Sequence, residues 1–168
     1  MNTDLVTQYD RALRVIDRIV SWVVIAAMAA LLVVVSLQVF FRYVFNESLV
    51  WGWDVPRLCF IVAMLMSIPL GLRYNAHVGI DLVFEKFPAA MQKGVLRLNA
   101  ALMFALFAIA AYFGVALLMQ TADQMMPGIQ LSVGWFYVAL IVSQIHCCLH
   151  VVRILMLGRI TNEALGDA

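Results

Sequence analysis

The sequence has few charged residues. Only 12% of its 168 residues are Asp, Glu, Lys or Arg, whereas 65% are hydrophobic. A soluble domain has about a quarter of its residues charged and about half of them apolar. A chain of this length encloses too little interior to bury such an apolar excess. The composition therefore excludes an ordinary soluble enzyme and a disordered chain, and it predicts that the protein resides in a lipid bilayer.

Basic stripes and cysteine frameworks are also missing. The formal net charge is +1 and no face or segment is strongly basic, which excludes a nucleic-acid-binding protein. The three cysteines, Cys59, Cys147 and Cys148, lie in apolar stretches and form no CxxC pair or disulfide framework. There is no internal repeat, low-complexity tract or flexible linker. We therefore expect a single transmembrane domain over residues 1–168.

What the sequence does contain is four long apolar stretches. About 20 apolar residues are needed for a helix to cross roughly 30 Å of hydrocarbon. The stretches cover approximately residues 19–41, 55–72, 98–119 and 133–152. Backbone groups in lipid must be hydrogen-bonded within their own segment, so these stretches should be helices. The predicted fold class is an all-α membrane protein with four transmembrane helices, and Pro69 should leave the carbonyl of Leu65 without its helical donor.

The first apolar stretch could also be read as a cleaved signal peptide. The apolar run is too long for a typical signal peptide, and the residues before it include Asp4, Asp10 and Asp17 as well as arginines. An uncleaved membrane anchor is therefore the favoured interpretation.

Two further segments have the pattern of amphipathic helices at the membrane interface. They cover residues 4–18 at the N-terminus and 79–97 between the second and third spans, and apolar residues recur in both at helical spacing. In the first segment the charged residues, Asp17 among them, are predicted to lie largely off the apolar stripe. Such a stripe can rest on lipid headgroups or on a partner subunit, and the pattern does not distinguish these two.

The distribution of basic residues predicts the orientation. Nine of the eleven lysines and arginines precede the first span, connect the second and third spans, or follow the fourth. The other two, Arg42 and Arg57, belong to the opposite side. The positive-inside rule then places both termini in the cytoplasm and the loops 42–54 and 120–132 outside.

Candidate chemical groups are scarce. His146 and His150 stand one helical turn apart, as metal or haem ligands can, but the glutamate of an HExxH site is missing. Haem in a membrane bundle usually needs histidines on facing helices, and the remaining histidine, His77, falls in a predicted loop. We expect His150 to reach the cytoplasmic interface and His146 to hydrogen-bond within the bundle or to a partner. No catalytic, cofactor-binding or metal-binding residue is predicted.

The apolar spans also lack the groups of a transport pathway. No ionisable residue lies in the first or third span, where a transporter would carry them. Small residues in the first span, Ala26, Ala27 and Ala30, would allow another helix to approach closely. Polar residues concentrate instead in the first outer loop. There Asp54 is predicted to cap the second span and to pair with Arg57.

The residues around this loop carry a family resemblance. The run Gln38-Val39-Phe40-Phe41-Arg42-Tyr43-Val44-Phe45-Asn46, followed by Ser48-Leu49 and Trp51, is the core of it. Further matching positions are Arg57, Arg73, His77, Gly79, Asp81 and the run Trp135-Phe136-Tyr137. This pattern resembles the small membrane subunit (DctQ-like) of TRAP, or tripartite ATP-independent periplasmic, transporters. It departs from the family where two acids usually follow the Trp, since these positions hold Trp53 and Asp54, and where Ser132 and Val142 replace prolines.

The resemblance implies a non-catalytic subunit of the bacterial inner membrane with four helices. Its implied partners are a large multi-span subunit that carries the sodium and substrate sites, a periplasmic substrate-binding protein that delivers an organic acid, and membrane lipids. The small subunit would brace the large one, so that no cofactor is expected. The candidate interface residues at the periplasmic rim are Arg42, Tyr43, Asn46, Trp51, Asp54 and Arg57, and those of the cytoplasmic loop are His77 and Asp81.

Two alternatives from other classes remain at this stage. One is the membrane anchor of a b-type cytochrome that uses His146 or His150. The other is a small exporter that works alone as a homodimer.

Overall fold

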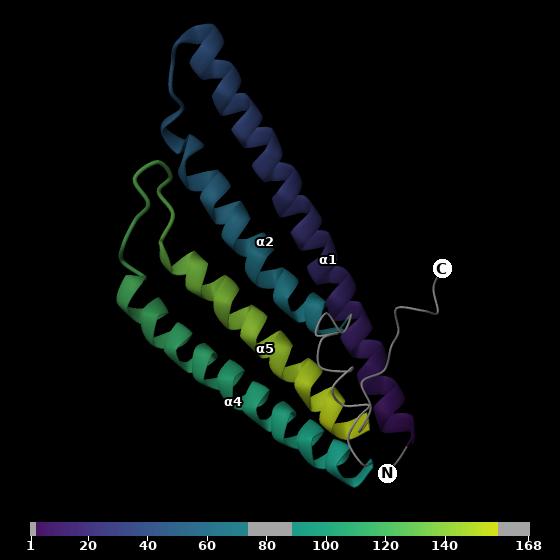
Figure 1. Ribbon diagram of the computed structural model, residues 1–168. Coiled ribbons are helices and arrows are strands. Elements are labelled where there is room, and N and C mark those ends of the chain that lie inside the picture. Colours follow the sequence, from purple (N-terminus) through teal and green to yellow (C-terminus); the bar gives the residue numbers. More distant parts are fainter. Residues whose placement is uncertain (1–2, 74–88, 158–168) are drawn as a thin grey trace, which may run out of the picture.

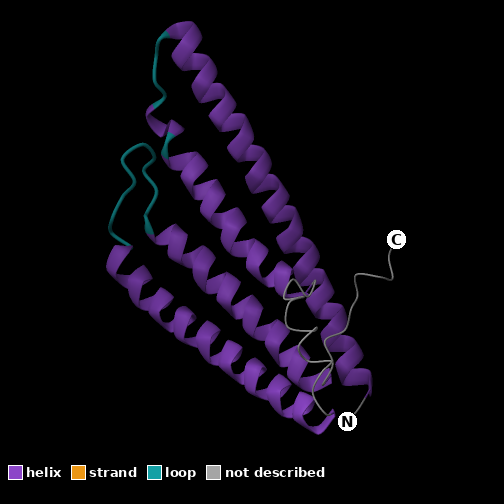
Figure 2. Cartoon of the chain, viewed as in Figure 1, coloured by secondary structure: helices purple, strands orange, loops and turns teal. Residues whose placement is uncertain are grey.

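The computed structural model describes residues 3–73 and 89–157, and these form four long helices (Figures 1 and 2). The helices are α1 (Thr3–Phe40), α2 (Asp54–Arg73), α4 (Ala89–Thr121) and α5 (Gly134–Leu157). A π-helix (Phe41–Phe45) and a 3-10 turn (Val50–Gly52) join α1 to α2. All four helices are long and apolar enough to cross a membrane. The predicted all-α membrane fold is confirmed.

The helices lie side by side in a row, in the order α1, α2, α5, α4 (Figure 1). Because α2 and α5 have a neighbour on each side, buried residues gather between them and the outer helices. One apolar cluster joins Leu72 of α2 and Ala100 of α4 to Val151 of α5. A second joins Val20 of α1 to Met66 of α2. The row is thus held together by contacts between neighbouring helices.

Helix α1 is continuous from Thr3 to Phe40, so residues 4–18 are not a separate helix. Its inner face at this end consists of Leu13, Asp17 and Val20, which are all buried, whereas Ile16 is exposed. The prediction that Asp17 lies off the buried stripe is therefore wrong. Of the second amphipathic segment, residues 89–97 form the first turns of α4 and residues 79–88 lie outside the described residues. The interfacial placement of both segments stays a prediction.

A proline inside α2 is matched by a serine on α5. Pro69 cannot donate to the carbonyl of Leu65 four residues earlier. The hydroxyl of Ser143, which is fully buried, donates to this carbonyl oxygen at 2.5 Å. The backbone group that Pro69 leaves free is thus hydrogen-bonded across the α2–α5 contact, as a carbonyl in lipid requires.

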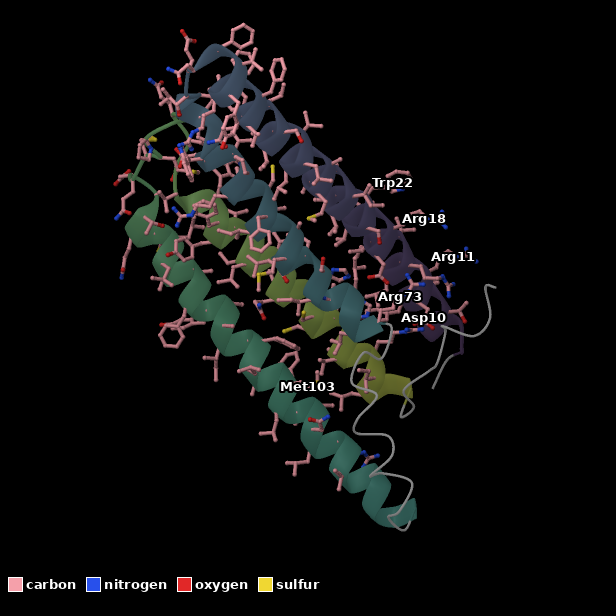
Figure 3. All side chains as sticks on the ribbon, turned by 45° about the horizontal axis from the view of Figure 1, so that its top comes forward. Asp10, Arg11, Arg18, Trp22, Arg73 and Met103 are labelled. Carbon is pink, nitrogen blue, oxygen red and sulfur yellow. The ribbon has the colours of Figure 1, made fainter. Side chains whose placement is uncertain are left out.

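The outer helices expose large apolar side chains. Trp22 of α1 is 66% exposed and Leu106 of α4 is 63% exposed. In Figure 3, Arg11, Arg18 and Trp22 project from the outer side of α1, whereas Asp10 and Arg73 lie on its inner side. Such surfaces are expected in a protein surrounded by lipid or by another membrane subunit.

Candidate functional site

At one end of the four-helix bundle, the loop after α1 meets the loop before α5. The backbone N–H of Gly128 donates to Oδ2 of Asp54 at 2.6 Å. A Cβ on Gly128 would stand 2.4 Å from the carbonyl oxygen of Val50 and 3.0 Å from Cα of Trp51. Only glycine permits this approach. The predicted rim residues Trp51 and Asp54 are therefore brought together, but by a glycine that sequence analysis did not single out.

The loop that carries Gly128 is internally hydrogen-bonded. The N–H of Met126 donates to the carbonyl of Leu131 at 2.9 Å, and the N–H of Val133 donates to that of Gln124 at 2.8 Å. These bonds fix the shape of the loop itself, and the bond from Gly128 to Asp54 joins its tip to the start of α2. The dipeptide Pro127-Gly128 was the available sequence signal for this turn.

The prediction that Arg57 pairs with Asp54 is wrong. Its guanidinium carbon lies 5.3 Å from the ring centroid of Phe136, at the start of α5. A cation above an aromatic ring is stabilised by the negative face of the ring. The two charged residues thus make separate contacts, Asp54 with the loop before α5 and Arg57 with α5 itself.

Arg42, Tyr43 and Asn46 close the end of α1. The first two belong to the π-helix Phe41–Phe45 and are exposed, Tyr43 to 82%. Asn46 has φ 54° and ψ 26°, and its backbone N–H donates to the carbonyl of Phe41. This left-handed residue turns the chain back toward α2. The role of the six rim residues as an interface stays a prediction, and the predicted loop residues His77 and Asp81 lie outside the described residues.

The opposite end of the bundle contains four polar side chains that lie close together, largely away from solvent. We call them the Asp17 cluster: Asp17, Arg73, His146 and His150. Nε2 of His146 lies 2.8 Å and Nε2 of His150 lies 2.9 Å from Oδ1 of Asp17. Nη1 of Arg73 lies 3.4 Å from Oδ2. Asp17 is 1% exposed, His146 3% and His150 2%. A carboxylate so deeply buried requires such partners, because an unpaired buried charge is very costly.

Three helices supply this cluster: Asp17 belongs to α1, Arg73 is the last residue of α2, and both histidines belong to α5. Beyond the end of α2, α1 and α5 meet directly: the hydroxyl of Tyr9 donates to the carbonyl of Leu149 at 2.8 Å. Nε of Arg153 also donates to Oδ1 of Asp10, at 2.8 Å. The expected hydrogen bond of His146 within the bundle is confirmed. The expectation that His150 reaches the interface is wrong, because its imidazole turns inward to Asp17.

The two imidazoles do not have the arrangement of axial haem ligands. Both belong to α5, their ring centroids are 4.9 Å apart, and both point to the same carboxylate oxygen. A porphyrin needs its two ligands on opposite faces of the ring plane. The geometry therefore gives no support to a b-type cytochrome.

Comparison with known proteins identifies the family. Residues 31–160 match the family of tripartite ATP-independent periplasmic transporters, DctQ component. The chain belongs to the DctQ family. The matched region contains the rim residues and both histidines of the Asp17 cluster, whereas Asp17 itself precedes it. With four helices long and apolar enough to span a membrane, this DctQ-family chain is a multi-pass protein of the inner membrane.

Several curated relatives are similar to it. The chain is 25% identical over 131 residues to a putative TRAP transporter small permease protein of Haemophilus influenzae, covering 77% of this chain and 79% of that protein. It is 28% identical over 97 residues to the sialic acid TRAP transporter small permease protein SiaQ of Vibrio cholerae, covering 57% and 56%. It is 25% identical over 77 residues to the C4-dicarboxylate TRAP transporter small permease protein DctQ of the same organism, covering 46% and 33%.

Proposed function

We propose that this chain is the non-catalytic small subunit of a sodium-coupled TRAP transporter for organic acids, and that it braces a large transport subunit in the inner membrane. The family match over residues 31–160 carries the proposal. Relatives are named for sialic acid and for C4-dicarboxylates, and both substrates are organic acids. A periplasmic substrate-binding protein would deliver the substrate to the assembled transporter.

The distribution of polar residues supports a bracing role. Within residues 19–40 and 98–119, which form the apolar parts of α1 and α4, there is no Asp, Glu, Lys or Arg. Transport pathways usually contain ionisable groups at this depth. These outer helices instead offer apolar side chains to whatever surrounds them. A chain of this kind is suited to packing against a partner that carries the pathway.

Another relative supports the pairing with a larger membrane protein. The chain is 22% identical over 103 residues to the sialic acid TRAP transporter permease protein SiaT of Haemophilus influenzae. The alignment covers 61% of this chain but only 17% of that protein. A sequence like this one therefore occurs within a much longer permease. Such a fusion of a small-subunit-like segment to a larger permease is expected when the two proteins act side by side.

The test is co-purification from the native membrane together with transport. A tag on this chain should retain a larger membrane protein through detergent extraction, and deletion of the chain should abolish sodium-dependent uptake by the bacterium. Radiolabelled succinate and sialic acid are suitable probes, since the relatives are named for these substrate classes. Undiminished uptake after deletion, with no co-purifying protein, would contradict the proposal.

Paired substitutions can identify the edge of the row that meets the partner. Ala26 and Ala30 are exposed one turn apart on α1, and Ala101 and Ala105 are exposed one turn apart on α4. Replacing one pair by Phe should block the close approach of a partner helix, while the other pair serves as the matched control. We expect one pair to reduce the yield of the complex and the other to leave it unchanged. If both variants give the same yield of complex as the wild-type chain, the partner packs elsewhere.

A further inference from the structure

The Asp17 cluster has the composition of a metal site. One ring nitrogen of His146, one ring nitrogen of His150 and a carboxylate oxygen of Asp17 all lie within 4.8 Å of one another. Two imidazole nitrogens and one carboxylate oxygen are a common ligand set for Zn²⁺ and other divalent transition metals. We propose that Asp17, His146 and His150 bind one divalent transition-metal ion between α1 and α5. This inference is independent of the proposed transport function.

The distances fit such an ion with small shifts. Zinc binds nitrogen and oxygen ligands at about 2.0–2.2 Å, which separates tetrahedral ligand atoms by roughly 3.3 Å. The present separations from Oδ1 are 2.8 and 2.9 Å. Each contact would open by about half an ångström to admit the ion, which lies within the range of side-chain rotation. The fourth position would remain for water or another ligand.

The surrounding charge restricts which ion can bind. Arg73 lies 3.4 Å from Oδ2 of Asp17, so that the carboxylate is already neutralised on one side. The site then offers little net negative charge, and its affinity must come from the imidazole nitrogens. Mg²⁺ and Ca²⁺ prefer oxygen ligands and several carboxylates. The ligand set therefore favours Zn²⁺, Co²⁺ or Ni²⁺ over Mg²⁺ and Ca²⁺.

Hydrogen bonding alone gives a poorer account of the two histidines. Both imidazoles share one oxygen of Asp17, and Nδ1 of His146 is buried with no hydrogen-bond partner among the described residues. One imidazole would satisfy Oδ1 without burying a second polar ring. A metal ion would use both nitrogens at once. A metal-bound histidine usually donates its other N–H to a partner, and Nδ1 of His146 has none among the described residues. We therefore expect a metal affinity about 10- to 100-fold below that of a site in which both histidines have such a partner.

The location indicates what the ion would do. The α2 helix lies between α1 and α5 in the row, and the hydrogen bonds that join α1 directly to α5 come from Tyr9, Asp10 and Asp17, near the N-terminus of α1. An ion bound to Asp17 and to both histidines would tie these two helices together. Metal binding should therefore raise the thermal unfolding midpoint of the protein, since the ion binds only the folded arrangement.

The experiment uses the full chain in detergent, stripped with a chelator and titrated with Co²⁺ and then Zn²⁺. We expect one Co²⁺ per chain, with the intense visible absorption of a tetrahedral site, displacement by Zn²⁺, and no displacement by millimolar Mg²⁺. The variants His146→Gln, His150→Gln and Asp17→Asn should each weaken binding by more than the roughly 100-fold that loss of a supporting contact costs. Cys147→Ser is the matched control, because Cys147 is a buried thiol adjacent to His146.

The outcomes are distinct. Failure of the wild-type chain to bind Co²⁺ or Zn²⁺ overturns the proposal, and this measurement does not depend on whether any variant folds. Binding that survives in the double variant His146→Gln/His150→Gln, or that is lost in Cys147→Ser, also overturns it. Circular dichroism of the metal-free variants confirms that the helices are intact, so that loss of binding reports the loss of a ligand.

Discussion

Asn46 illustrates how a single residue ends the first membrane helix. Its φ of 54° lies in the left-handed region, which costs most residues about 1–2 kcal/mol, whereas Gly is free of this cost and Asn tolerates it. Asn46→Gly should therefore leave the free energy of unfolding nearly unchanged, and Asn46→Val should lower it by about 1–2 kcal/mol. Unfolding of the detergent-solubilised protein by increasing denaturant measures both values. A loss in Asn46→Gly as large as that in Asn46→Val would show that the Asn side chain, rather than the backbone conformation, is what matters.

The Asp17 cluster marks the limit of prediction at the scale of residues. The i, i+4 spacing of His146 and His150 predicted a shared face correctly. Asp17, however, is a charged residue flanked by Ile16 and Arg18, and local pattern favours a surface position for it. Its burial depends on partners 129 and 133 residues away along the chain. The one local signal for its burial is the helical spacing that places Asp17 between Leu13 and Val20, and this signal does not name the partners.

The stability contributions of Pro69 on α2 and Ser143 on α5 should depend on each other. Ser143→Ala leaves the carbonyl of Leu65 without a donor and should cost about 1–2 kcal/mol, the upper end for hydrogen bonds between membrane helices. In a Pro69→Ala background the helical N–H returns, so the same substitution should cost less than half as much. A double-mutant cycle on the free energy of unfolding measures this coupling.

Ser67→Ala is the control for this cycle. The hydroxyl of Ser67 donates to the carbonyl of Ala63 within the same helix, at 2.7 Å. That carbonyl keeps its regular helical donor, and loss of the hydroxyl should be nearly neutral. Equal costs of Ser143→Ala in both backgrounds would contradict the proposed pairing.

The contact between the outer loops makes a separate prediction. Gly128→Ala would place a Cβ 2.4 Å from the carbonyl oxygen of Val50, so the two loops must separate and the bond to Asp54 must lengthen or break. We expect Gly128→Ala to lower the thermal unfolding midpoint. If the partner subunit contacts these loops, the yield of the complex should fall as well. Gly94→Ala on α4, where a Cβ would meet nothing within 4 Å, should be neutral or stabilising by up to about 1 kcal/mol. Equal midpoints for the two variants would exclude a role for the loop contact.

At the scale of elements, the sequence predicted the helices but not their order. Each apolar stretch had to be helical because lipid provides no hydrogen bonds to the backbone. Which helix lies beside which depends on the faces they bury, and stretches apolar on all sides do not reveal these faces. The outer loops show the same limit. Asp54 was expected to cap α2 and to pair with Arg57; it is the first residue of α2, but its carboxylate accepts from Gly128, which is 74 residues away.

For the whole molecule, the orientation in the membrane can be tested directly. Nine of eleven basic residues flank one side, so we expect the N-terminus of α1 in the cytoplasm and the loop at Asp123 in the periplasm. With the three cysteines replaced by Ser, Asp123→Cys should react with a membrane-impermeant maleimide in spheroplasts. Arg11→Cys should react only after the membrane is permeabilised. The reverse labelling pattern would require the opposite orientation.

The order of the helices in the row also bears on how the protein folds. The pairs α1–α2 and α4–α5 are each joined by a short connection and lie side by side, whereas α2 and α5 meet across a long interval of chain. Each pair can insert into the bilayer as a helical hairpin soon after its synthesis, and the two hairpins can then dock within the membrane. The hydrogen bonds from Ser143 to Leu65 and from the histidines to Asp17 cross this late contact. We therefore expect these bonds to form last in folding, and substitutions in them to affect the docking of complete hairpins rather than their insertion.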